Sequence, residues 1–290
     1  MKYAYYPGCS LKGTGRAYEE SLLAVFRALD VELEELEDWN CCGATTYISY
    51  GELQSYALAA RNLSLAKQTG NELIAPCAAC YLVLNKTQHC VHDYPWIGEI
   101  VDRALDAIKL PRDISVKVRH PLEILLNDVG LDRLKAKVVH PLSGLKIAPY
   151  YGCQMVRPYA LFDNQRNPTS MDRVLEACGA TIVHYPVKTH CCGGSQKGTL
   201  PEIGLNLIRR LLTEAQRNGA EVIATVCPLC QFNLEGFQDE ARSTSAFHIP
   251  VLYFTQLLAV ALGIPLKAAG FQRSFVSIEP LLAEKEIAYA

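Results

Sequence analysis

The chain has 290 residues, half of them hydrophobic, so it can bury a substantial core and is long enough for two domains. Its 28 Lys and Arg residues against 30 Asp and Glu residues leave a net charge of −2, which argues against a nucleic-acid-binding surface. No uncharged apolar run approaches the ~18 residues of a membrane span, and no secretory signal is visible. Twelve cysteines in such a chain indicate a reducing, cytoplasmic setting in which thiols bind metals or carry out redox chemistry.

The first half is predicted to alternate strands and helices. Its strands are expected at Lys2–Tyr6, Val31–Leu36 and Leu73–Ala75. The spacing of apolar residues predicts helices over Tyr18–Leu29 and Gly51–Thr69 and a helix that opens at Cys77. The acidic residues between Glu32 and Asp38 are interpreted as a solvated strand face.

A cysteine-free stretch, residues 91–140, has helices predicted over Trp96–Ile108 and Pro121–Leu134, and Pro141–Gly144 is the expected linker. The second half repeats the pattern of the first, with strands predicted at Leu145–Tyr150, Ala180–Tyr185 and Glu221–Val226. Its predicted helices are Asp172–Cys178, Ile203–Asn218, one opening at Cys227, and an apolar core helix within Val251–Leu266. This alternation predicts an α/β fold of two Rossmann-like domains, 1–142 and 143–290, each with a small parallel sheet and related by a pseudo-twofold axis.

Ten of the twelve cysteines form one pattern that occurs twice. The first copy is Cys9, the pair Cys41-Cys42 and Cys77-x-x-Cys80. The second copy is Cys153, the pair Cys191-Cys192 and Cys227-x-x-Cys230. Four of the five equivalent pairs are 150 residues apart (191 − 41, for example), and the first pair is 144 residues apart (153 − 9). A repeat this regular predicts one cysteine-rich site in each domain.

Each group of cysteines directly follows a predicted strand. Because the carboxyl ends of parallel strands meet at one edge of a sheet, three loops should bring five sulfurs together in each domain. The two Cys-x-x-Cys motifs also open helices, where backbone N–H groups and the helix dipole favour thiolates. Glycines beside the cysteines (Gly8, Gly43, Gly152, Gly193 and Gly194) would let the backbone approach a bulky inorganic group.

Five sulfurs per site narrow the choice of what each site holds. Zinc takes four ligands in a tetrahedron, so five cysteines exceed its need. A thioredoxin-like thiol–disulfide couple could use either Cys-x-x-Cys motif, but it leaves three cysteines of each copy without a role. An iron–sulfur cluster accounts for all five, although the contiguous cysteine spacing of ferredoxins is absent. Iron–sulfur clusters are therefore the favoured interpretation, with structural zinc and metal-free thiols as the alternatives.

Three further residues are candidates outside the repeat. Cys178 and Cys90 have no repeat partner, so Cys178 is interpreted as a small core residue and Cys90 as a structural or surface residue. His190 directly precedes Cys191, so it could donate a hydrogen bond to a cluster sulfur or protonate a thiolate product. Its counterpart in the first copy is Asn40, which is also a hydrogen-bond donor.

This arrangement of cysteines resembles the cysteine-rich CCG-domain family, whose best-known member is the B component of heterodisulfide reductase. The resemblance extends to Tyr-Pro-Gly-Cys9, to Asp38-Trp39-Asn40-Cys41 and to Pro250–Leu257, and so covers nearly the whole chain. In that family each five-cysteine set binds a noncubane [4Fe-4S] cluster, so the resemblance implies two such clusters here. The implied ligands are Cys9, Cys41, Cys42, Cys77 and Cys80 in the first site and Cys153, Cys191, Cys192, Cys227 and Cys230 in the second.

Two motifs depart from those of the methanogen enzymes. Cys41-Cys42-Gly43-Ala44-Thr45 stands where those enzymes have Cys-Cys-Pro-Ala-Pro-Gly, and Cys9-Ser10-Leu11-Lys12 stands where they have Cys-Ile-x-Pro. The chain looks more like bacterial-type relatives, which are subunits of heterodisulfide-reductase-like sulfur-oxidising or flavin-linked complexes and of unusual succinate dehydrogenases. The coenzyme M–coenzyme B disulfide is therefore not the expected substrate.

The resemblance implies an oxidoreductase acting on sulfur groups, namely a catalytic subunit that reduces or forms a disulfide or related sulfur bond. The chain shows no flavin, nicotinamide or ferredoxin motif, so two partners should exchange electrons with it. These are an iron–sulfur protein similar to the C component of heterodisulfide reductase and a flavoprotein similar to its A component. The alternative is a non-catalytic subunit that passes electrons from a succinate or 2-hydroxyacid dehydrogenase towards quinone. Membrane contact is not expected, because the apolar segment near the C-terminus lacks a basic flank.

Overall fold

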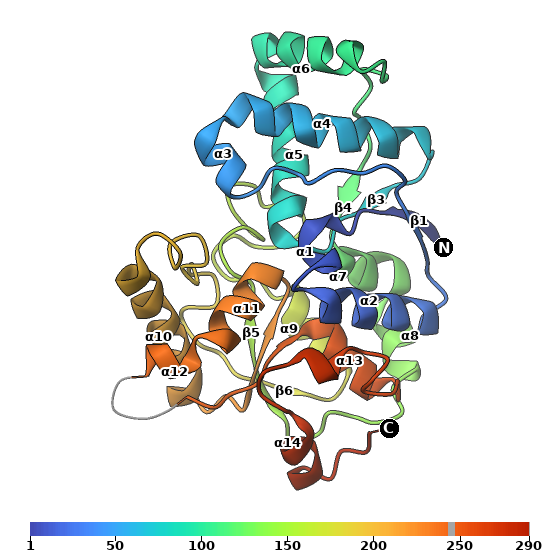
Figure 1. Cartoon of the computed structure of the whole chain (residues 1–290). Coiled ribbons are helices and arrows are strands. Elements are labelled where there is room, and N and C mark those ends of the chain that lie inside the picture. Colours follow the sequence, from blue (N-terminus) through green and yellow to red (C-terminus); the bar gives the residue numbers. More distant parts are fainter. Residues whose placement is uncertain (243–246, 290) are drawn as a thin grey trace.

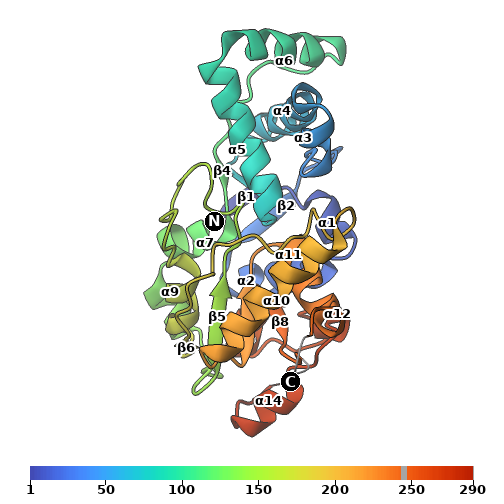
Figure 2. The same cartoon turned by 90° about the vertical axis from the view of Figure 1, so that its left-hand side faces the viewer.

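The computed structural model describes residues 1–242 and 247–289, which form two four-stranded parallel sheets surrounded by helices (Figures 1 and 2). The first sheet has the order β2-β1-β3-β4, formed by Glu32–Glu35, Lys2–Tyr5, Leu73–Ile74 and Val118–Arg119. The second sheet has the equivalent order β6-β5-β7-β8, formed by Thr181–Ile182, Lys146–Tyr150, Val222–Thr225 and Val251–Tyr253. The predicted α/β class and the duplicated parallel sheet are therefore confirmed.

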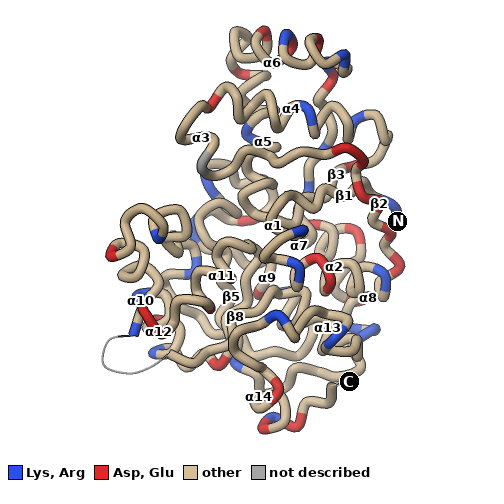
Figure 3. Tube along the Cα trace, in the orientation of Figure 1, with Lys and Arg blue, Asp and Glu red and all other residues tan. Residues whose placement is uncertain are grey.

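The position of each strand in its sheet follows from its sequence. Strand β7 reads Val-Ile-Ala-Thr and is buried along its whole length, as expected for an inner strand covered by helices on both faces. Strand β2 lies at the edge of the first sheet, and its glutamates are exposed and carry the acidic stretch visible in Figure 3. Lys2 and Lys12 pair with two of these glutamates, Glu34 and Glu35, at 3.1 and 2.7 Å. The acidic run is thus a solvated strand face, as predicted.

Helices connect the strands in both halves. Those of the first half are α1 (Gly8–Lys12), α2 (Arg16–Ala28), α3 (Thr46–Tyr50), α4 (Glu52–Gln68), α5 (Ala78–Asp93), α6 (Pro95–Ala107), α7 (Pro121–Ile124), the π-helix η1 (Leu125–Val129) and α8 (Leu131–Ala136). Those of the second half are α9 (Ser170–Ala177), α10 (Pro201–Arg217), α11 (Pro228–Gly236), α12 (Gln238–Ala241), α13 (Phe254–Ala261), the 3-10 helix η2 (Phe271–Arg273) and α14 (Glu279–Glu284). Figures 1 and 2 show α6 and α14 at opposite ends of the molecule. Within the described residues, no helix combines the length and the hydropathy needed to cross a membrane.

The two halves pack through a reciprocal exchange of helices. Helix α2 follows the first strand of the first half and packs against α13, which follows the last strand of the second half. Helix α9, which follows the first strand of the second half, packs in turn against α7, which follows the last strand of the first half. The contact between α2 and α13 includes a buried hydrogen bond of 2.6 Å between the hydroxyls of Ser21 and Thr255. The α2–α13 and α9–α7 contacts are equivalent in the two halves, as expected for two similar units related by a twofold axis.

Several segments differ from the sequence-based expectation. Within Val251–Leu266, predicted as a helix, the first three residues form β8 and only Phe254–Ala261 is helical, because β7 offers Val251 a hydrogen-bonded neighbour that no local pattern reveals. Strand β4 is an addition to the predicted strands, and Pro121–Leu134 is three short helical pieces broken at Gly130, where φ is +80°.

The first sheet ends at Arg119 and the second begins at Lys146, so the predicted domain boundary at residue 142 falls between them and stays a prediction.

Candidate metal centres

Both five-cysteine groups lie at the carboxyl edge of a sheet. In the first half, β2 pairs with one side of β1 and β3 pairs with the other side, so the direction of strand succession reverses at β1. In parallel sheets, ligands bind at the carboxyl edge beside such a reversal. Cys9 follows β1 on the first turn of α1, and Cys77 follows β3 as the N-cap of α5. Cys41 and Cys42 come from the loop after β2. The second half has the same order of strands and cysteines, except that Cys153 lies in a turn after β5 and not on a helix.

The cysteines of each half converge in pairs. The Sγ atoms of Cys9 and Cys41 are 3.6 Å apart, and those of Cys42 and Cys80 are 3.3 Å apart. In the second half, the Sγ atoms of Cys192 and Cys230 are 3.4 Å apart, and the thiols of Cys153 and Cys191 also interact. All ten cysteines singled out from the sequence are free thiols in these two groups.

Burial divides each group into a deep part and an outer part. Cys42, Cys77 and Cys80 are buried, as are their counterparts Cys192, Cys227 and Cys230. Cys9 and Cys41 are exposed, and Cys191 is exposed beside the half-buried Cys153. Each site therefore has three sulfurs fixed in the protein interior and two at a face that other molecules can reach.

One outer thiol in each group has a strongly lowered pKa, which favours its thiolate form. Hydrogen bonding from Cys42 and Cys9 lowers the pKa of Cys41 to about 2. Hydrogen bonding from Cys153 and Cys192 lowers the pKa of Cys191 to about 2, and the backbone N–H of Gly193 donates to the same sulfur at 3.3 Å. Thiolates are the form of cysteine that binds metal.

The two groups adjoin each other at the domain interface. Cys77 and Cys227, which are equivalent positions in the repeat, lie close enough across the boundary for Cys227 to lower the pKa of the Cys77 thiol. The hydroxyls of Thr45 and Ser195, another equivalent pair 150 residues apart, lie 3.4 Å from each other. Since equivalent residues meet only near a twofold axis, the pseudo-twofold axis passes between the two sites.

Two tyrosines that the sequence analysis did not single out hold the Cys-Cys loops. Tyr6 donates a hydrogen bond of 2.7 Å to the carbonyl of Asn40, which precedes the first cysteine pair. Tyr150 donates a bond of the same length, 2.7 Å, to the carbonyl of His190, which precedes the second pair. Both tyrosines are fully buried, and their separation of 144 residues equals that of Cys9 and Cys153, which is the signal that could have revealed them.

The candidates Asn40 and His190 differ in their surroundings. The Asn40 amide donates to the carbonyls of Cys41 and Leu58 at 2.8 and 3.1 Å, so it fixes the first Cys-Cys loop. The side chain of His190 is half-buried beside Cys191, and its main-chain carbonyl is held by Tyr150. Its role towards a cluster sulfur stays a prediction.

The carbonyl of Pro76, directly before Cys77, receives hydrogen bonds from two other buried residues. Tyr18 donates at 3.2 Å and the His120 ring lies at 2.9 Å. Because His120 Nδ1 accepts the N–H of Leu122, its proton is on Nε2, which therefore donates to Pro76. Burial lowers the pKa of His120 to about 3, so the ring is neutral.

The residues of each group fit an iron–sulfur cluster. Each group supplies only thiols, the ligands on which protein iron–sulfur clusters are held. Gly8 and Gly152 have φ of +69°, and a Cβ on them would lie 2.9 Å from Cys80 Sγ and 3.4 Å from Cys230 Sγ, so the backbone closes tightly around the sulfurs. Among the described residues, no group of three His, Cys, Asp or Glu side chains is placed so that it could hold a single metal ion.

Gly8→Ala is expected to lower the iron content of the first site, because the new Cβ would displace Cys80. Gly70→Ala is the matched control: its φ is +72°, but nothing lies within 4 Å of the new Cβ. Both variants should lose about 1 kcal/mol of stability through the positive φ. Iron and sulfide analysis should show a deficit only in Gly8→Ala, and equal iron in both variants would contradict the close approach at Cys80.

The profile described as "Cysteine-rich domain" (CCG) matches residues 3–85 and 147–235, which together make up more than half of the chain and contain all ten clustered cysteines. The chain belongs to the CCG family. Each matched segment contains one cysteine group and the first three strands of one sheet, whereas β4 and β8 lie outside the match.

Several proteins resemble this CCG chain along almost its whole length. The 8-methylmenaquinol:fumarate reductase membrane anchor subunit of Wolinella succinogenes is 30% identical, over 97% of this chain and 99% of that protein. An Archaeoglobus profundus protein described as similar to the B component of heterodisulfide reductase is also 30% identical, over 93% of this chain and 94% of that protein. The B component of a ferredoxin:CoB-CoM heterodisulfide reductase of Methanosarcina mazei is 26% identical, over 98% and 96%.

One solved structure shares the fold. A hypothetical protein from Helicobacter pylori superimposes with a TM-score of 0.74 at 14% identity, over 95% of this chain and 52% of that chain. At this identity the likeness concerns the fold alone.

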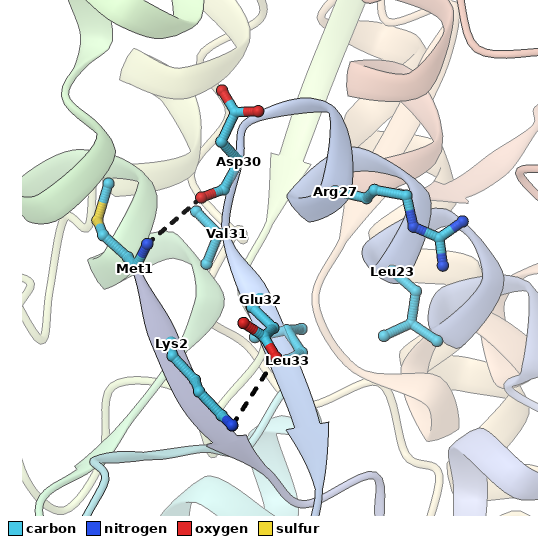
Figure 4. Close-up of a pocket in the computed structure, with 8 residues that line it drawn as sticks. All are labelled: Met1, Lys2, Leu23, Arg27, Asp30, Val31, Glu32 and Leu33. Carbon is cyan, nitrogen blue, oxygen red and sulfur yellow. Dashed lines mark hydrogen bonds and ion pairs between the residues drawn. The ribbon is translucent and has the colours of Figure 1, made fainter.

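The remaining cysteines and a hollow near the N-terminus lie apart from the CCG sites. Cys178 is fully buried at the C-cap of α9, where burial raises its pKa to about 12, in agreement with a core residue. Cys90 is buried on α5 and hydrogen-bonds to Tyr56 at 3.3 Å. The hollow, of about 430 Å³, is lined by residues including Lys2 and Glu32 (Figure 4). It lies at the amino ends of β1 and β2, which is the edge opposite the cysteines.

Proposed function

We propose that each CCG domain holds one noncubane [4Fe-4S] cluster on its five cysteines and that the chain is the catalytic subunit of a heterodisulfide-reductase-like complex. It would reduce or form a disulfide, or a related sulfur bond, on a small-molecule or carrier substrate. The observation that carries the proposal is the pair of adjoining all-thiol sites, each with an exposed face. The relatives named as components of heterodisulfide reductases support it.

The cluster would supply one-electron transfer and iron atoms that can bind sulfur. The protein's own residues would do the rest. Buried Cys42, Cys80 and their counterparts fix each site, and the paired loops around Thr45 and Ser195 bring the two sites together, so that both sulfurs of one disulfide could be engaged. Electrons would come from an iron–sulfur partner similar to the C component of heterodisulfide reductase and a flavoprotein similar to its A component, in a cytoplasmic complex.

A second candidate function is favoured by the relative from Wolinella succinogenes, which is part of a fumarate reductase. In this version the chain passes electrons between a dehydrogenase or reductase and quinone, and no substrate binds at the clusters. The outer cysteines then serve only as ligands, and thiols should not alter either site.

Anaerobically purified protein is expected to contain about eight irons and a similar amount of acid-labile sulfide, four per cluster. Its EPR spectrum should change when a thiol or disulfide is added, if substrate sulfur binds at a cluster. Eight irons with no response to thiol would favour the electron-transfer function. Zinc without iron would overturn both functions.

A further inference from the structure

Tyr253 carries a buried hydroxyl that has no hydrogen-bond partner. Its side chain is 1% exposed, and its Oη is one of five such orphaned side-chain atoms in the part of the chain that the structure describes. Buried hydroxyls are nearly always paired, and an unpaired one is costly. We therefore expect the Tyr253 hydroxyl to donate to an acceptor that the protein alone does not provide.

The fold places Tyr253 close to the two chain segments that carry the buried Cys227 and Cys77. Tyr253 ends β8 opposite Thr225 of β7, and Cys227 follows Thr225 by two residues. On its other side, the Tyr253 ring stacks on Tyr18, with ring centroids 4.5 Å apart and an interplanar angle of 7°. Tyr18 in turn donates to the carbonyl of Pro76, the residue before Cys77.

The equivalent residue in the first half shows what is unusual about Tyr253. His120 is the N-cap of α7 after β4, as Tyr253 is the N-cap of α13 after β8. The His120 ring donates to the carbonyl of Pro76 at 2.9 Å, so its donor is satisfied within the protein. Tyr253 has the corresponding place but keeps its donor free beside the second site.

The hydroxyl of Tyr253 is a neutral O–H donor. The sulfurs of Cys227 and Cys77, which lie on neighbouring segments, become negative when they bind metal. A neutral buried donor next to negative sulfur forms a charge-assisted hydrogen bond.

We propose that Tyr253 donates a hydrogen bond to a sulfur of the cluster held by the second CCG domain, at or beside Cys227, and thereby raises that cluster's reduction potential. The inference rests on the proposed function, because it requires the cluster. Hydrogen bonds to cluster sulfurs stabilise the more negative, reduced state and so favour reduction. The two clusters would then differ in potential although their cysteine sets are the same.

The test compares Tyr253→Phe with Tyr18→Phe in the complete, anaerobically purified protein. Both changes remove one oxygen from the same buried ring stack, but the Tyr18 hydroxyl is already bound to a backbone carbonyl. Redox titration followed by EPR should show one cluster shifted to a more negative potential in Tyr253→Phe and little change in Tyr18→Phe. The shift should persist when the first cluster is removed by Cys42→Ser and should vanish when the second is removed by Cys192→Ser.

The outcomes separate this inference from the proposed function. Wild-type protein without iron–sulfur clusters would overturn both. Wild-type protein with two clusters and a Tyr253→Phe variant of unchanged potentials would overturn the hydrogen bond alone. If Tyr253→Phe does not assemble clusters, the hydrogen bond is tested by placing 3-fluorotyrosine at position 253. The hydroxyl of 3-fluorotyrosine is more acidic and is therefore a stronger hydrogen-bond donor. A rise in one potential would support the hydrogen bond, and unchanged potentials would overturn it.

Discussion

Replacing Cys42 by serine is expected to remove the first cluster and leave the second, so that iron falls from about eight to about four per chain. Cys42 is buried and its Sγ lies 3.3 Å from Cys80 Sγ, within its own domain. Its counterpart Cys192 has the same kind of contact with Cys230, at 3.4 Å, and Cys192→Ser should remove the second cluster alone. Iron and sulfide analysis gives the number of clusters that each variant retains, and EPR shows which cluster remains.

Cys178→Ala and Cys90→Ala are the controls, and both should retain all the iron because these residues lie outside the two groups. Cys77→Ser should behave differently from Cys42→Ser. Its thiol interacts with Cys227 across the boundary, so its loss should disturb both clusters. If Cys42→Ser also removed both clusters, the two sites would not be independent, and a loss of iron in Cys178→Ala would refute its assignment to the core.

Arg119→Met is expected to destabilise the folded protein by about 3 kcal/mol, because it leaves the buried Glu123 and two partly buried carboxylates without their cation. The Arg119 side chain is 5% exposed and binds Asp128, Glu72 and Glu123 at 2.7, 2.9 and 2.9 Å. The hydrogen bonds from Arg119 lower the pKa of Asp128, whereas burial raises the pKa of Glu123. Because methionine fills a similar volume, the lower free energy of unfolding would reflect the missing charge and not a cavity.

The matched control is Arg112→Met, which removes an arginine that pairs with Asp106 at the surface and should leave the stability unchanged. Urea unfolding at neutral pH compares the free energy of unfolding of both variants with that of the wild type.

The ion pairs of Arg119 also support the first cysteine site. Since Arg119 ends β4 and His120 follows it, these ion pairs help to hold the hydrogen bond from His120 to Pro76, the residue before Cys77. Arg119→Met should therefore also weaken cluster retention at the first site. A stability equal to that of Arg112→Met would show that the network is not needed.

Strand and helix prediction succeeded where local pattern is sufficient. Apolar runs such as Val222–Thr225 and amphipathic stretches such as Arg16–Ala28 and Pro201–Arg217 carry their own periodicity, and all three appear close to the predicted bounds. The short strands Val118–Arg119 and Val251–Tyr253 carry too few residues for a period. They are strands only because β3 and β7 offer them hydrogen-bonding edges, and this is tertiary information.

The sequence by itself determined the repeat, the α/β class, the family and the grouping of ten cysteines, because strand–loop–helix order places every loop of a parallel sheet at one edge. Only the tertiary structure decided which sulfurs are deep and which are exposed, and that Cys77 meets Cys227 near the pseudo-twofold axis. Only the structure revealed the buried donors Tyr6, Tyr150 and His120 and the orphaned hydroxyl of Tyr253. The physical reason is that burial and hydrogen-bond satisfaction depend on partners brought from distant parts of the chain, which local patterns do not encode.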